Sequence, residues 1–168
     1  NRLIRFVLWY KPNATFFNDK GGMRWCGNEA GSAAHAQWCV VPYELCSIAE
    51  HKTEVEPLME GTLEEIRNSD TALGSISNIM YSKALTFCPA ETDMSIRPGW
   101  FYHENEEPHS LDRLFETYLR TVGGNTTFNL NIPPMPNGKF NEKDVERLKE
   151  LGDKINAEFG TNLAEDAI

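Results

Sequence analysis

The chain has 168 residues, 16 of them Lys or Arg and 25 Asp or Glu, for a formal net charge of −9. A chain of this length buries roughly 70% of its unfolded surface, enough for one globular domain with its own core. With 40% apolar and 24% charged residues, the composition excludes a disordered or collagen-like protein. The acidic balance argues against nucleic acid as a partner. No apolar run approaches the roughly 20 residues of a membrane span, so no membrane partner is expected.

The first half of the chain predicts a helix followed by short extended segments. Apolar residues at helical spacing predict a helix over 1–10, which Lys11-Pro12 ends. Short β-type runs predict extended segments at 14–17 and 23–26. A further helix is predicted over 70–85.

The second half has stronger periodicity. Alternation predicts a strand over 90–97, and an apolar stripe predicts a helix over 110–122. A second alternating strand is predicted over 126–132 and a last helix over 141–159. Helices that alternate with about four short strands predict an α/β fold with a parallel sheet. We expect a single domain over the whole chain.

The four cysteines are Cys26, Cys39, Cys46 and Cys88, and no two have Cys-x-x-Cys spacing. His35 and Cys39 lack a second close pair of ligands, so no zinc site is expected. Ordinary buried thiols are the expected state of the cysteines. One or two disulfides are the alternative if the chain is extracytoplasmic.

The first cluster of chemically useful residues is Arg24-Trp25-Cys26-Gly27-Asn28-Glu29. A predicted strand leads there into a Gly-containing turn that carries a carboxylate. At the C-terminal end of a β/α strand such a residue points into the mouth of an active site. A structural Glu29 paired with Arg24 is the alternative, and the local pattern alone favours it.

The second cluster spans 89–103. Its strand places Glu91, Asp93 and Arg97 on one face, and Trp100 and His103 follow among aromatic residues. Sugar sites combine such groups, because carboxylates and Arg bind hydroxyls and aromatic faces stack on sugar rings. A buried ion pair with core aromatic residues is the alternative interpretation, and the pattern fits both equally.

These clusters, in this order, resemble the catalytic domain of the glycoside hydrolase family 29 α-L-fucosidases. The resemblance is carried by 24–31 (RWCGNEAG), 89–103 (PAETDMSIRPGWFYH), 118–134 (YLRTVGGNTTFNLNIPP) and 162–167 (NLAEDA). The chain is most similar to the branch that acts on α-1,3/1,4-linked fucose. The resemblance implies the C-terminal part of a TIM-type (β/α)8 barrel, incomplete because a full barrel needs ~200 residues or more.

The resemblance also implies a retaining reaction by two carboxyl groups and no metal or organic cofactor. Glu29 is the expected acid/base, and Glu91 is its rival. A general acid must be held protonated near neutral pH, which apolar surroundings from Trp25 and Trp38 would favour. The nucleophile of the family is an Asp at an earlier strand end. No such motif is present, and Asp19 resembles a non-nucleophilic loop residue, so the nucleophile is expected upstream of this chain.

The resemblance implies a sugar and aglycone pocket shaped by several further residues. They are Arg24, Trp25, Asn28, Glu91, Asp93, Arg97, Trp100 and His103. For Arg97, an ion pair with Asp93 is the structural alternative.

The expected partner is a fucosylated oligosaccharide or glycan, with no cofactor. Such glycans lie outside the cytosol, so an extracellular, periplasmic or lysosome-like location is expected. The missing N-terminal half of the barrel is a further expected partner. Two alternatives stay open. One is a non-catalytic carbohydrate-binding remnant, and the other is an interaction domain that self-associates through unpaired sheet edges.

Overall fold

A computed structural model describes residues 2–17, 22–27, 29–33, 37–43, 79 and 82–162. The chain forms two compact units. Unit 1 comprises Asn1–Cys26 and Ala34–Glu91, and unit 2 comprises Gly27–Ala33 and Thr92–Ile168. No helix in the described ranges is both long and apolar enough to cross a membrane.

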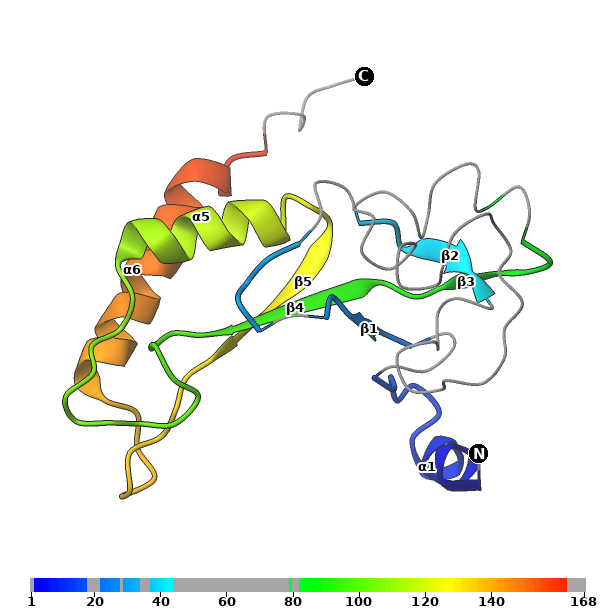
Figure 1. Cartoon of the computed structure of the whole chain (residues 1–168), viewed down its shortest axis with the longest axis horizontal. Coiled ribbons are helices and arrows are strands. Elements are labelled where there is room, and N and C mark those ends of the chain that lie inside the picture. The colour runs from blue at the N-terminus through cyan, green and yellow to red at the C-terminus, as the bar shows by residue number, and fades with distance from the viewer. Residues whose placement is uncertain are drawn as a thin grey trace. The chain divides into compact units, whose positions relative to one another are not determined.

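Among the described residues of unit 1, a helix is followed by short paired strands (Figure 1). Helix α1 (Arg2–Tyr10) confirms the prediction, and its backbone ladder stops at the turn that contains Pro12. Strand β1 (Arg24–Trp25) confirms the segment predicted at 23–26 and pairs in parallel with Ala90 and Glu91. Strands β2 (Val40–Pro42) and β3 (Leu85–Phe87) form an antiparallel pair.

In unit 1, the strand predicted at 14–17 is wrong, and the helix predicted over 70–85 is tested only near its end. The segment predicted as a strand at 14–17 forms only an isolated bridge from Phe17 to Met23. Leu85, predicted to end a helix, begins β3, and most of the range 70–85 lies outside the described residues. Short β segments depend on distant pairing partners, which local patterns do not reveal.

The expectation of an ordinary buried thiol is wrong for Cys88, because this cysteine is disulfide-bonded. Its side chain is fully buried with Val41 in the small core of unit 1. Its backbone N–H donates to the carbonyl of Cys39 at 2.7 Å, just beyond the β2–β3 pair. Cys46 lies outside the described residues.

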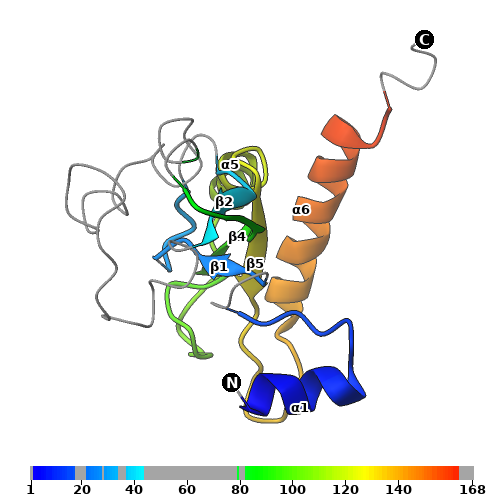
Figure 2. The ribbon, with the colours of Figure 1, turned by 90° about the vertical axis from the view of Figure 1, so that its right-hand side faces the viewer.

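Unit 2 contains the elements with the strongest sequence periodicity. Strand β4 (Ala90–Ser95) enters it at Thr92 and is followed by α5 (Leu111–Thr121) and β5 (Thr126–Asn131). Helix α6 (Glu142–Phe159) comes last and is one unbroken helix in Figure 2. All four predictions are confirmed, with ends displaced by no more than a few residues. The side chains of Ser110 and Asn141 cap α5 and α6 by accepting backbone N–H bonds.

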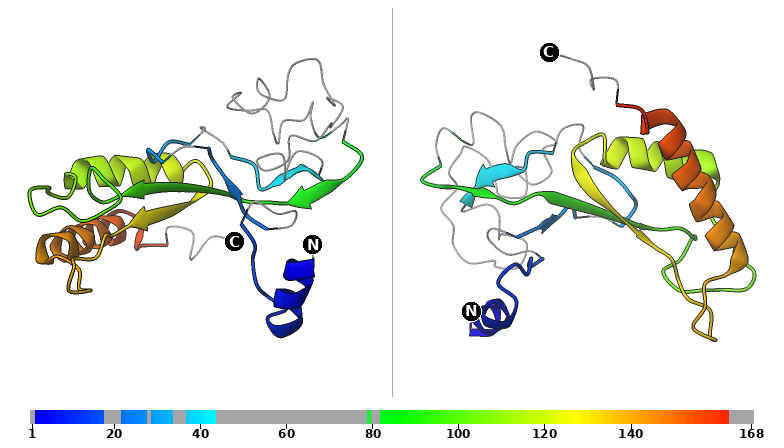
Figure 3. Two further views of the ribbon diagram at one scale, coloured as in Figure 1. Left: turned by 60° about the horizontal axis from the view of Figure 1, so that its bottom comes forward. Right: turned by 180° about the vertical axis from the view of Figure 1, so that it is seen from behind.

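Strands β4 and β5 run side by side in the same direction (Figure 3). At their starts, the hydroxyls of Thr92 and Thr126 are 3.1 Å apart. At their ends, the Asn131 amide donates to Ser95 Oγ at 3.1 Å, and the N–H of Ile96 donates to the carbonyl of Asn131 at 2.9 Å. Because starts and ends match, β4, α5 and β5 form a parallel β-α-β unit. The predicted α/β fold with a parallel sheet is therefore confirmed.

The core of unit 2 lies between this β-α-β unit and α6. Its buried members are Met94, Ile96, Leu114 and Leu151, and half-buried apolar residues from α5, β5 and α6 surround them. At the end of α6, the Phe159 ring stacks on the Phe115 ring of α5, and the two ring centroids are 6.5 Å apart. This packing fixes the carboxyl ends of β4 and β5, from which the candidate site is built.

Candidate functional site

The loop that carries Glu29 belongs to unit 2 and is shaped by two glycines. Gly27 and Gly31 have positive φ angles of 85° and 66°, a backbone conformation that residues with a Cβ rarely adopt. The N–H of Gly31 donates to the carbonyl of Asp93 at 3.1 Å, which ties the loop to β4. A Cβ on Gly31 would lie 2.5 Å from Thr117 Cγ2, so only glycine fits there. Glu29 itself stays exposed.

Trp100 joins the two sequence clusters inside unit 2. Its indole Nε1–H donates to Glu29 Oε2 at 2.9 Å, across 71 residues of sequence. The Trp100 side chain is partly exposed, at 37%, so the pair lies at the surface. The structure thus brings two predicted site residues into direct contact.

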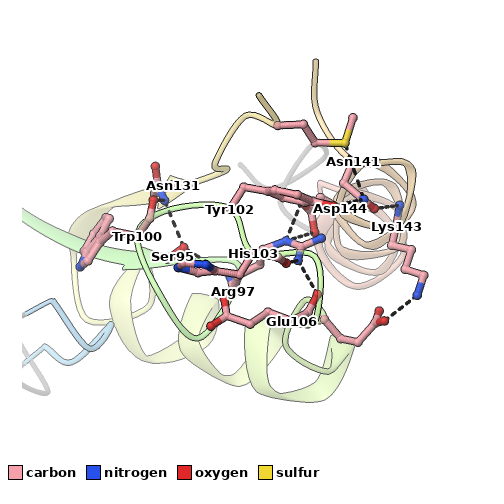
Figure 4. Close-up of polar contacts among 12 residues, drawn as sticks. Ser95, Arg97, Trp100, Tyr102, His103, Glu106, Asn131, Asn141, Lys143 and Asp144 are labelled. Carbon is pink, nitrogen blue, oxygen red and sulfur yellow. Dashed lines mark hydrogen bonds and ion pairs between the residues drawn. The ribbon is translucent and has the colours of Figure 1, made fainter. Parts of the chain in front are cut away.

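Asn131 holds the backbone of Trp100 in place. From the end of β5, its amide Nδ2 donates to the carbonyl of Trp100 and to Ser95 Oγ, both at 3.1 Å (Figure 4). Asn131 was not predicted as a site residue. The available signal was its place in the last residue of a strand, two residues before Pro133.

Arg97 has a structural role, and its predicted ion pair with Asp93 is wrong. Its buried guanidinium donates through Nε to both carboxylate oxygens of Asp144, each at 2.9 Å. Its Nη1 donates to the carbonyl of His103 at 3.1 Å and to that of Glu106 (Figure 4). These donors are bonded within the protein, and the predicted sugar contact of Arg97 stays a prediction. Asp144 was missed because it lies 47 residues away, in the first turn of α6.

The remaining unit 2 predictions have mixed outcomes. The side chain of His103 is exposed, while its carbonyl is used by Arg97. Asp93 is half-buried at the middle of β4. Asn28 lies outside the described residues.

In unit 1, Arg24 is buried and serves as a structural donor. Its guanidinium donates to the carbonyl of Cys88, to Gln37 Oε1 at 3.0 Å and to the carbonyl of Trp38 at 2.8 Å. Burial lowers the pKa of Arg24, and the nearby thiols of Cys26 and Cys39 partly offset this. Both Nη1 and Nη2 of Arg24 are thus bonded inside unit 1, and its predicted contact with a sugar stays a prediction.

The neighbours of Arg24 on β1 and β4 differ in exposure. Glu91, the rival acid/base, is buried, and its carbonyl accepts the N–H of Cys26 at 2.9 Å. Trp25, paired with it in register, remains partly exposed. Of the two candidate carboxyl groups, Glu29 is therefore the one that solvent can reach.

No group of three or more His, Cys, Asp or Glu side chains suited to a metal ion occurs among the described residues. The group in unit 2 that can take part in a reaction is the Glu29 carboxyl group, which is hydrogen-bonded to the Trp100 indole N–H. Such a group can give a proton to an oxygen atom and take one back. Glycosidases use such a carboxyl group together with a second one.

Comparison with known proteins defines the family. The model of the α-L-fucosidase family matches residues 7–158, and the chain belongs to this family. The chain is 34% identical over 169 aligned residues to alpha-L-fucosidase 1 of Arabidopsis thaliana, covering 96% of this chain and 29% of that protein.

Two solved structures are similar as well. One is a glycoside hydrolase 29 family member from an unknown rumen bacterium, with 32% identity, a TM-score of 0.66, and coverage of 98% of this chain and 26% of that one. The other is a GH29 fucosidase of Ruminococcus gnavus in complex with fucose, with 25% identity, a TM-score of 0.60, and coverage of 85% and 25%. The chain therefore spans less than a third of the length of these relatives.

Proposed function

We propose that this chain takes part in the hydrolysis of terminal α-L-fucosyl linkages and supplies the acid/base residue, Glu29. The observation that carries the proposal is the exposed Glu29 carboxylate fixed by the Trp100 indole. Family membership supports the reaction class. The buried position of Glu91 favours Glu29 over its rival.

The proposed reaction is a double displacement with retention. Glu29 donates its proton to the glycosidic oxygen while a second carboxylate attacks the anomeric carbon. The C–O bond to the aglycone breaks, and a fucosyl ester forms. Glu29, now ionised, then takes a proton from water, which attacks the anomeric carbon and releases fucose and the nucleophile. Retention needs the two carboxyl groups ~5–5.5 Å apart. We place the nucleophile in a barrel segment outside these residues.

The proposed architecture is a partial TIM-type barrel that forms one domain, with about four βα units. The parallel β4-α5-β5 unit supports it. The coverage of under a third of each longer relative is also consistent with a part of a larger barrel. We keep the α-1,3/1,4 branch as the proposed linkage class.

The proposed substrate is a fucosylated glycan outside the cytosol. The fucose bound in the Ruminococcus gnavus relative supports the sugar. The disulfide at Cys88 supports the proposed extracellular, periplasmic or lysosome-like location, because disulfides persist in oxidising compartments and are rare in the cytosol. The net charge of −9 argues against a nucleic-acid partner.

Hydrolysis of an aryl α-L-fucoside tests the proposal. The chain is assayed alone and as a chimera in which it replaces the matching part of the Arabidopsis relative. Glu29→Ala is expected to lower turnover by roughly 10²–10⁴-fold, with partial rescue by azide on an activated fucoside. The matched control is Glu158→Ala, because Glu158 is an exposed glutamate at the end of α6.

Three outcomes contradict the proposal in different ways. Full activity in Glu29→Ala rules out its acid/base role. A folded chimera that binds fucose without hydrolysis favours the carbohydrate-binding alternative. Self-association of the chain with no affinity for fucose favours an interaction domain.

A further inference from the structure

Trp100 makes the one hydrogen bond that the Glu29 side chain has within the described part of the chain. An indole N–H is a donor only, so it can bind a carboxyl oxygen but never accept its proton. It occupies Oε2 at 2.9 Å and leaves Oε1 for other partners. The two oxygens of Glu29 are therefore chemically different in this structure.

The backbone of Trp100 and of the loop that follows it is held by several contacts. The Trp100 carbonyl accepts from Asn131 at 3.1 Å, and Asn131 is anchored to Ser95. The loop after Trp100 surrounds the Arg97 side chain. Arg97 donates to two backbone carbonyls of this loop and to the buried carboxylate of Asp144. The Tyr102 ring lies beside the Arg97 guanidinium (Figure 4), and its centroid is 4.8 Å from the guanidinium carbon. The backbone from which the indole projects is therefore held in place.

The Glu29 loop is fixed independently at its other end. Gly31 is bonded to the Asp93 carbonyl and packs too closely on Thr117 for any other residue. With the backbone held at Gly31 and the carboxylate held by Trp100, Glu29 is constrained at both ends of its side chain.

From these contacts we infer that Trp100 is a positioning residue for Glu29 and selects Oε1 as the oxygen that carries the catalytic proton. The inference rests on the proposed acid/base function of Glu29. The indole donor serves both halves of the reaction without changing its own protonation. In the first half, Oε1–H gives its proton to the glycosidic oxygen. In the second half, the ionised Oε1 takes a proton from water, while Oε2 keeps the same N–H bond.

The contact is tested by NMR on the chain itself. The chain has four tryptophans, and Trp100→Phe identifies the Trp100 indole signal by removing it from the ¹H–¹⁵N spectrum. Glu29→Ala should shift this signal upfield and speed its exchange with water, because the oxygen that accepts the indole N–H is lost. Glu104→Ala, at an exposed glutamate on the same loop, should leave the signal unchanged. A Trp100 signal that is the same in the parent chain and in Glu29→Ala overturns the inference.

The role is tested by kinetics on whichever form hydrolyses fucosides in the assay above. Acid assistance matters for a poor leaving group and little for an activated one. Trp100→Phe should therefore lower kcat/KM about 10–100-fold on a fucosyl disaccharide, but change it less than about twofold on an activated aryl fucoside. The matched control is Trp9→Phe, at an exposed position on α1. It should leave kcat/KM unchanged on both substrates.

Equal losses on both substrates would mean that Trp100 acts through folding or sugar binding, and would overturn the positioning role. The proposed function fails in a distinguishable way. If Glu29→Ala has no preference between the two leaving groups, Glu29 is not the acid/base, whatever the NMR shows. If no form hydrolyses fucosides, the role of Trp100 falls together with the proposed function, while NMR still reports the contact.

Discussion

The buried ion pair between Arg97 and Asp144 gives the strongest prediction about stability. The two side chains are 1% and 0% exposed, and the Asp144 carboxylate accepts from Arg97 Nε through both oxygens at 2.9 Å. Asp144→Ala leaves the guanidinium buried without its counter-charge. Removing one partner of such a pair costs about 3–5 kcal/mol, since the remaining charge is desolvated and uncompensated.

Part of that cost is offset by contacts that Arg97 keeps. Two carbonyls still accept from Nη1, and the Tyr102 ring lies against the guanidinium. These contacts still stabilise the guanidinium charge when Asp144 is absent, so the charge is not left wholly uncompensated. The expected loss therefore lies at the lower end, about 3 kcal/mol of unfolding free energy.

Urea unfolding followed by far-UV circular dichroism measures this loss. Asp153→Asn on the exposed face of α6 is the matched control and should stay within about 0.5 kcal/mol of the parent chain. Replacing both partners with apolar residues, Arg97→Met with Asp144→Leu, should recover most of the loss. If Asp144→Ala costs less than about 1 kcal/mol, the pair does not hold the loop, and the reasoning is refuted.

Two further predictions concern the site loop and the pH dependence of stability. Gly31→Ala should cost at least about 1–2 kcal/mol, because its φ is 66° and its Cβ would meet Thr117 at 2.5 Å; Gly152→Ala in α6, where nothing lies within 4 Å, should instead stabilise by up to ~1 kcal/mol in the same urea assay. Burial, aided by the Arg113 guanidinium, lowers the pKa of His109 below its usual 6.5, although a backbone hydrogen bond with the segment at Arg97 opposes this. The unfolded chain then binds the proton more readily, so stability should be full above about pH 6.5 and fall as the pH drops through the lowered folded pKa. His109→Gln should flatten that part of the stability–pH profile, and an unchanged slope would rule out His109 as its source.

The helices of unit 2 could be predicted because their signals are local. Helix α5 carries an apolar stripe, a capping Ser110 and terminating glycines within one short stretch. Asn141 and Gly160 bound α6 in the same way. Each of these features acts within one or two turns of its own helix, so sequence order is a sufficient guide.

The site could be predicted only in part, because its decisive contacts are long-range. The residue types of both clusters identified Glu29 and Trp100 as candidates, but no pattern indicated that they touch across 71 residues. Sequence proximity favoured Asp93 as the partner of Arg97, whereas the fold supplies Asp144. A guanidinium pairs with the carboxylate that the tertiary packing brings close to it, and the local sequence does not reveal which carboxylate that is.

The way Arg97 holds the loop after β4 has a consequence for how this surface can change. Arg97 donates hydrogen bonds to the backbone carbonyl oxygens of His103 and Glu106, not to their side chains. Every residue carries such a carbonyl, so these two bonds do not depend on the side chains at positions 103 and 106. Phe101, at 79% exposure, sits next to Trp100 on this loop. Substitutions there can alter the surface beside Glu29 while the scaffold beneath stays constant, which leaves this stretch open to diversification by evolution or by design.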